Sequence, residues 1–377
     1  MKALLLERPA ESAALDGLRQ EVRDFLATHP FEPSYSMFGE FDPAFSEAVG
    51  SRGWIGMSFP KQYGGSERSI LERYVVLEEL LAARAPIYAH AVADRQSGPL
   101  LLRFGHEWQR REILPKIAAG TCYFCIGMSE PNSGSDLASV RTRATKVDGG
   151  YRVNGAKIWT SNAHRAHYMI LLCRTGAGSE SRHGGLSQLL VDMRTPGVTT
   201  RPIINLAGEH DFNEVVFEDA FVGEKMLIGE EGNGWAQVTS ELTFERAGPE
   251  RFISSHGVLE QLVDVLHRRL PHLSATNRER AEVAIGRLVA QLSTLRRISR
   301  SIATMLEHGE DPAFQAAMVS AGLLAAGLCR GRRGAAVLAG AGLLSLAPLA
   351  GDAFWRSFSG RGVRAVAGLR EDWRVHG

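Results

Sequence analysis

The chain has 377 residues, of which 44% are hydrophobic and 23% are charged, and its formal net charge is +1. These values are typical of a globular protein with about two or three structural units, and they give no reason to expect nucleic acid or an anionic membrane as a partner. Four cysteines (Cys122, Cys125, Cys173 and Cys329) include one isolated C-x2-C pair. Without a second pair or a histidine cluster, this favours core cysteines in a reducing cytoplasm over a zinc site.

Residues 1–117 show the periodicity of helices. Leu15–Ala27 places its apolar residues on one stripe, and Ile70–Ala83 is a second run of this kind. The first residues contain only about four apolar side chains before a charge, which is too few for the core of a signal peptide. We therefore expect an N-terminal helical domain and a cytoplasmic protein.

Residues 118–232 change to the periodicity of strands. Thr142–Val147 alternates, Asp148-Gly149-Gly150 is a turn, and Tyr151–Asn154 returns, which together predict a hairpin. Further short strands are expected at three places: Tyr168–Cys173, Gln188–Asp192 and Asn213–Phe217. This region is predicted to be a central β domain.

Residues 233–377 return to helical spacing. Arg278–Leu306 is predicted to be one long helix with Asn277 as its N-cap, and another helix is expected to begin near Pro312. Gly334–Ala350 is almost wholly apolar, but it is shorter than the ~20 residues of a membrane span and contains a proline, so a buried bundle helix is favoured. Because helices and strands are segregated, the fold class is α+β.

Two segments of the predicted β domain carry most of the chemical information. The first is Ser129-Glu130-Pro131 followed by Gly134-Ser135-Asp136, and the second is Ile158-Trp159-Thr160-Ser161. A flat aromatic side chain beside short hydroxyl groups suits a planar heterocycle with hydrogen-bonding edges. Together the two segments resemble the flavin-binding signature of the acyl-CoA dehydrogenase family, and the resemblance extends over nearly the whole chain.

This resemblance implies the family's layout, a helical N-terminal domain, a central β-barrel or sandwich and a C-terminal four-helix bundle, with FAD as cofactor. Ile126, Met128, Ser129, Trp159 and Ser161 are expected around the flavin. Ser129 would bond the pyrimidine edge of the ring, Trp159 would pack against it, and Ser161 would donate to N5, where hydride arrives. The alternatives are a Ser/Gly-rich turn without a ligand and a tryptophan that only packs in the core.

The resemblance also implies an acyl-CoA substrate, with Ser135 near the pantetheine or nucleotide part of the thioester. Removal of the α proton needs a carboxylate, which many family members carry late in the chain. The corresponding segment here, Phe354–Val363, contains none and presents Arg361 or Ser359. Other members carry the base on the first helix after the β domain. Glu245 is therefore the candidate base and Arg246 a substrate-binding residue, the alternative being a surface salt bridge between the two.

The motifs that hold the adenosine half of the flavin in this family are absent or displaced. Where family members have Arg-x-x-Phe-Gly this chain reads His267–Ser274, and where they have Gln-x-x-Gly-Gly it reads Ala336–Gly342. The resemblance therefore implies an acyl-CoA dehydrogenase that oligomerises, either with itself or as one subunit of a heterotetramer that shares the site, and that passes electrons to an electron-transfer flavoprotein. A flavin-dependent oxidase or monooxygenase of the same fold and a non-catalytic partner subunit are the alternatives.

Two further segments are candidates for positions near the acyl channel. His90, Asp94, Arg95 and Gln96 fit either that channel or a helix surface, and Ala207–Asn213 fits either the site or a plain connection between two strands.

Overall fold

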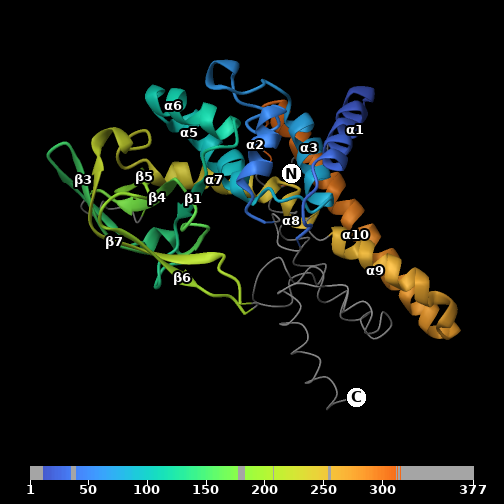
Figure 1. The fold of residues 1–377 in the computed structure, drawn as a ribbon. Helices are drawn as coiled ribbons and strands as arrows, with labels where there is room; N and C mark the ends of the chain where they lie inside the picture. Colours follow the sequence, from blue (N-terminus) through green and yellow to red (C-terminus); the bar gives the residue numbers. More distant parts are fainter. Residues whose placement is uncertain are drawn as a thin grey trace, which may run out of the picture. The chain divides into compact units, whose positions relative to one another are not determined.

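The computed structural model describes residues 12–34, 40–176, 183–206, 208–253 and 256–310, together with Pro312 and Gln315. The chain forms two compact units (Figure 1). One contains the segments Met1–Phe45, Arg68–Tyr88 and Arg246–Gly377, and the other contains Ser46–Glu67 and Ala89–Glu245. We call them the helical unit and the sheet unit.

The sheet unit is built on seven strands. They are β1 (Phe124–Gly127), β2 (Arg143–Val147), β3 (Gly150–Ser161), β4 (Tyr168–Arg174), β5 (Leu186–Asp192), β6 (Val198–Ile203) and β7 (Phe212–Gly223). The strand order is β1-β4-β2-β3-β7-β6, and β5 pairs with β4 off this path. β1 and β2 run parallel to β4, whereas the other neighbouring strands are antiparallel. The expected hairpin of Thr142–Val147 with Tyr151–Asn154 is therefore confirmed, because Arg143–Val147 pairs with Gly150–Asn154.

The core of the sheet unit follows from the alternation of its strands. Cys125, Tyr151, Met169, Val191 and Phe217 come from five different strands and share one buried cluster. β4 and β5 are buried along nearly their whole length, so their sequences read as continuous apolar runs. Cys122 and Cys173 are also buried, and burial raises the pKa of each thiol to about 12. The expectation of core cysteines is confirmed for these described residues.

Helices before and after the strands complete the sheet unit. Those before it are α2 (Pro43–Ser51, shared with the helical unit), η1 (Lys61–Tyr63), α4 (Tyr88–Val92), η2 (Ala93–Ser97), α5 (Gly98–Phe104) and α6 (Glu107–Ala118). The buried Gln109 of α6 donates to the carbonyl oxygens of Lys225 and Leu227, which ties α6 to the turn after β7. α7 (Gly234–Ala247) follows, and a Cβ at Gly234 would lie 2.7 Å from the backbone of Leu186, so glycine permits this close start.

The helical unit contains α1 (Ala13–Thr28), α3 (Ile70–Ala82), α8 (Glu250–Ile253), α9 (His256–Arg269), η5 (Leu270–His272) and α10 (Ala275–Glu307). A buried carboxylate joins three of these helices, because Glu78 of α3 accepts from Arg19 of α1 at 2.9 Å and from Arg296 of α10 at 2.6 Å. Burial raises the pKa of Glu78, but the two guanidinium groups outweigh this effect and hold it below its ordinary value. Such charges stay ionised inside a protein only when they are paired.

Several sequence-based expectations can be compared with these elements. The order of helices, a central β region and further helices is confirmed. The cap of the long helix was wrong: Ser274, not Asn277, is the N-cap, and its hydroxyl accepts from the Asn277 N–H. His90, Arg95 and Gln96 are buried, so the helix-surface interpretation was also wrong for them.

Other expectations lie outside the described residues or remain predictions. The helix near Pro312, the apolar segment 334–350, Cys329 and the motif positions after residue 315 lie outside the described residues. Within the described residues, no helix has both the length and the apolar character that crossing a bilayer requires. The domain boundaries at 117/118 and 232/233 stay predictions.

Candidate functional site

The two segments singled out in the sequence lie side by side in the sheet unit. β1 leads into Met128 and Ser129, and the Ile158 N–H of β3 donates to the Ser129 carbonyl oxygen at 2.9 Å. Ile126 pairs with Ile170 of β4, and Met128 packs against the buried cluster that includes Val140. The backbone bond therefore places the Ser129 loop next to the strand that carries Trp159 and Ser161.

A buried ion pair fastens the two segments together. Lys157 is 0% exposed, and its Nζ lies 2.8 Å from Glu130 Oε1 and 3.0 Å from the Met128 carbonyl oxygen. The remaining capacity of the Glu130 carboxylate is filled by the backbone N–H groups of Arg141 and Thr142, at 2.7 and 2.9 Å. These three donors, one side-chain ammonium and two backbone N–H groups, thus fix the Glu130 carboxylate next to Ser129.

Each charge of this pair shifts the pKa of the other group. Burial raises the pKa of Glu130, but the Lys157 charge, its hydrogen bond and the backbone donors outweigh burial and lower the pKa below its ordinary value. Burial lowers the pKa of Lys157, and the Glu130 carboxylate opposes that shift. The pair is therefore ionised because each partner supplies the charge that the other needs.

The strand β3 breaks its alternation where the flavin ring is expected. The pairing of β3 with β7 shifts between Lys157 and Thr160, and Trp159 has a φ of +59°. Its indole is 58% exposed and meets Phe212 edge to face at 6.0 Å. Trp159 is thus a flat aromatic surface open to solvent in the described structure, which rules out the interpretation that it only packs in the core.

The hydroxyl groups expected at the flavin edge are both available. Among the described residues, neither the Ser129 nor the Ser161 side chain makes a hydrogen bond, and both residues are only partly buried. An exposed indole beside two unengaged hydroxyls fits a planar ring with acceptors along its edge. The residues present therefore suit a flavin ring.

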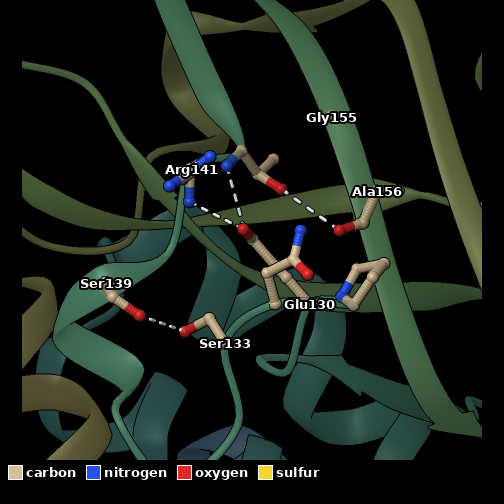
Figure 2. A pocket seen from close by; sticks show the side chains of 9 residues that line it. Glu130, Ser133, Ser139, Arg141, Gly155 and Ala156 are labelled. Carbon is tan, nitrogen blue, oxygen red and sulfur yellow. Dashed lines mark hydrogen bonds between the residues drawn. The ribbon is translucent and has the colours of Figure 1, made fainter.

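A cavity of about 200 Å³ opens next to this loop (Figure 2). It is lined by Glu130, Pro131, Asn132, Ser133, Ser139, Arg141, Thr142, Gly155 and Ala156. Figure 2 shows the hydrogen bond that the Ser139 hydroxyl donates to the Ser133 hydroxyl. It also shows the Glu130 carboxylate, which accepts a hydrogen bond from the backbone N–H of Arg141. Ser135 lies on the same loop and is exposed, but it does not line the cavity.

The candidate base lies on α7, which is anchored to the sheet by buried polar contacts. Gln188 of β5 donates to Glu241 of α7 at 2.6 Å, and Gln237 donates to the Ile228 carbonyl oxygen at 2.6 Å. Glu245 lies on the same helix, four residues after Glu241. Arg246 is the next residue on α7, and the roles of Glu245 and Arg246 stay predictions.

Sequence reasoning missed two groups near these residues. One is the Lys157–Glu130 pair, and the other is the contact of His164 and His210 with Asn213. A lysine inside a strand of otherwise alternating pattern was the available signal for the first. For the second, the segment Ala207–Asn213 contains two of the three members, but nothing in the sequence linked it to His164, because the three residues come from a turn, a loop and a strand.

Comparisons with known proteins agree with this arrangement. Residues 12–121 match the model of the acyl-CoA dehydrogenase N-terminal domain, and residues 125–220 match that of the middle domain. Acyl-CoA dehydrogenase IpdE1 of Mycobacterium tuberculosis is 40% identical over 203 residues, which are 54% of this chain and 52% of that protein. The match therefore spans about half the length of this curated relative.

Two solved structures are similar in fold and sequence. The "Tcur3481-Tcur3483 steroid ACAD" is 28% identical with a TM-score of 0.71, covering 90% of this chain and 92% of that chain. The ChsE4-ChsE5 complex from Mycobacterium tuberculosis is 29% identical with a TM-score of 0.71, covering 84% of this chain and 82% of that chain. The matched domains, the strand arrangement and the exposed Trp159 beside two serines lead to one conclusion: the chain belongs to the acyl-CoA dehydrogenase family.

Proposed function

We propose that the protein is an FAD-dependent acyl-CoA dehydrogenase that removes hydrogen from the α and β carbons of an acyl-CoA thioester. The observation that carries this proposal is the pairing of the Ser129 loop with the exposed Trp159 and Ser161, fixed from behind by the Lys157–Glu130 ion pair. Family membership supports the reaction class, and the chemistry of these side chains supports the cofactor.

In this proposal five residues of the sheet unit bind the flavin ring. Ile126, Met128 and Trp159 contact the flavin, and Ser129 and Ser161 donate hydrogen bonds to its edge. The flavin supplies the acceptor for the hydride that leaves the β carbon. A donor at the ring edge favours the negative charge that develops there.

The substrate side is assigned to α7 and to the loop after β1. Glu245 takes the α proton, Arg246 binds the thioester substrate, and Ser135 contacts the CoA portion. Support for Glu245 comes from its place on a helix that buried contacts from Gln188 and Gln237 hold rigidly against the sheet. A general base needs such support because its carboxylate must reach the proton within hydrogen-bond distance.

We further infer that the active form contains a second, homologous subunit and that an electron-transfer flavoprotein is the electron acceptor. The missing adenosine-side motifs motivate the second subunit, and two similar structures, the ChsE4-ChsE5 complex and the Tcur3481-Tcur3483 steroid ACAD, support it by analogy. Steroid-derived acyl-CoA thioesters are therefore the first substrates to try.

The test is purification of the chain alone and co-expressed with a homologous subunit from the same organism. A flavin spectrum that an acyl-CoA bleaches without oxygen is expected in one of these preparations. Glu245→Gln should keep the flavin and lose bleaching, whereas Glu224→Gln, an exposed carboxylate of the sheet unit, should keep both. Preparations without flavin would refute the proposal in favour of a non-catalytic subunit, and oxygen consumption on bleaching would indicate an oxidase.

A further inference from the structure

A buried amide lies directly behind the segment that carries Trp159 and Ser161. Asn213 of β7 is 0% exposed and is the partner of Thr160 in the strand pairing. Its Nδ2 lies 3.1 Å from the Thr160 carbonyl oxygen and 3.1 Å from His164 Nδ1, and its Oδ1 lies 2.8 Å from His210 Nε2. One amide therefore joins the strand to two imidazoles.

These contacts permit only one arrangement of protons. A carbonyl oxygen can only accept, so the Asn213 atom that faces Thr160 must be the amide nitrogen. The same nitrogen faces His164 Nδ1, which must then lack a proton, while His210 Nε2 must carry one to donate to Oδ1. The orientation of the amide and the relevant proton of each ring follow from a single carbonyl group.

The two imidazoles stack against each other. The rings of His164 and His210 lie 3.8 Å apart at an angle of 15°. Burial, followed by the charges of His210 and Arg165, lowers the pKa of His164 to about 4, against the pull of Asn213. His164 Nδ1 therefore stays an acceptor at neutral pH, as the contact with Asn213 requires.

The backbone of residues 159–162 is strained, and the hydrogen bond from Asn213 helps to hold it. Trp159 and Asn162 both have positive φ values, +59° and +52°, which side-chain-bearing residues adopt at a cost of ~1–3 kcal/mol each when neighbours hold them. Within the described residues, the buried Thr160 Oγ1 and Asn162 Nδ2 have no hydrogen-bond partner. The bond from Asn213 to the Thr160 carbonyl oxygen therefore acts between the two strained residues, without help from the Thr160 or Asn162 side chain.

We propose that Asn213, oriented by the stacked His164 and His210, is a positioning residue that sets the direction of Trp159 and Ser161. This inference rests on the proposed flavin function, because the Ser161 hydroxyl is the group it would aim at flavin N5. Asn213→Asp keeps the size of the side chain but turns a carboxylate oxygen toward the Thr160 carbonyl oxygen. The segment should then shift, and Ser161 should miss N5.

A comparison of two flavins tests this aim without measuring turnover. In 5-deaza-FAD a carbon replaces N5, so the hydrogen bond from Ser161 is lost and the rest of the ring is kept. In the preparation that carries flavin, alone or co-expressed, the wild type should bind FAD about 2- to 10-fold more tightly than 5-deaza-FAD, as one hydrogen bond predicts. Ser161→Ala should bind the two flavins equally.

Asn213→Asp should also lose the preference, although Ser161 is still present. Asn154→Asp is the matched control, because this amide lies on the same strand pair, is exposed, and accepts from the Asp219 N–H through an oxygen that aspartate retains. A general loss of stability weakens both flavins alike and leaves their ratio unchanged. The ratio therefore separates positioning from a merely structural role.

A second variant tests the same inference if Asn213→Asp does not fold. His210→Phe keeps an aromatic ring against His164 and removes the donor to Asn213, so it should reduce the preference as well. An unchanged preference in both variants would overturn this inference alone. Equal binding of the two flavins by the wild type would overturn it because Ser161 would not meet N5, and a wild type that binds neither flavin would overturn the proposed function with it.

Discussion

Replacing Lys157 with methionine should strongly destabilise the sheet unit. The substitution keeps most of the side-chain volume but removes the ammonium group that lies 2.8 Å from Glu130 and 3.0 Å from the Met128 carbonyl oxygen. The Glu130 carboxylate would keep only its two backbone donors. Breaking a buried ion pair from one side costs about 3–5 kcal/mol, and the cavity beside Glu130 admits solvent, so we expect a loss of about 3 kcal/mol.

The assay is thermal unfolding at pH 7, measured by calorimetry. For a unit of this size, ~3 kcal/mol corresponds to a fall in Tm of about 6–12 °C. Lys146→Met is the matched control, since this lysine of the neighbouring strand is 60% exposed and its carboxylate contacts are 3.7 and 3.9 Å long. It should change stability by less than about 0.5 kcal/mol.

The companion variant Lys157→Met/Glu130→Gln tests whether the unpaired charge of Glu130 causes the loss of stability. It removes both charges while glutamine still accepts from a backbone N–H, so it should recover at least half of the lost Tm. The non-additive part of this cycle measures the coupling between the two side chains. A fall of less than about 2 °C in Lys157→Met, or a double variant less stable than the single one, would refute the reasoning that the carboxylate depends on this lysine.

Three further predictions follow from other contacts. Gly155→Ala should lower the Tm of the sheet unit, because its φ is +144° and the new Cβ would lie 2.8 Å from the Thr142 Cα; an unchanged Tm would contradict this. Ser69→Ala should cost α3 about 1 kcal/mol in chemical unfolding, since Ser69 and Glu72 form a capping box, and Ser69→Asp should restore it. Because the pKa of His164 is about 4 when folded and near 6.5 when unfolded, the unfolded state binds the proton more readily between these values; stability should fall as pH drops from about 6.5 to 4, and His164→Gln should flatten that slope in pH-dependent melting.

The sequence predicted the regular parts of the fold because they follow the two standard periodicities. Leu18, Val22 and Phe25 repeat at helical spacing, and all three are buried in α1. The alternation of Arg143–Val147 likewise appears as β2 of the hairpin. Local pattern is enough at such places, because side-chain direction follows directly from backbone geometry.

The periodicity of the sequence does not predict the conformation of the strand that carries Trp159. A period of two places Lys157, Trp159 and Ser161 on one face of β3, yet Lys157 is fully buried and Trp159 is exposed. The positive φ of Trp159 and the shift of register against β7 separate them. Because tryptophan rarely adopts this conformation, no sequence rule assigns it here; only the surrounding contacts do.

The groups behind this irregular segment explain how it is maintained. Apolar contacts are non-directional, whereas a hydrogen bond to a defined carbonyl oxygen constrains both distance and angle. Lys157 fixes the Met128 carbonyl oxygen on one side of the segment and Asn213 fixes that of Thr160 on the other. In the proposed site, these two buried polar side chains together set a single direction for Trp159 and Ser161.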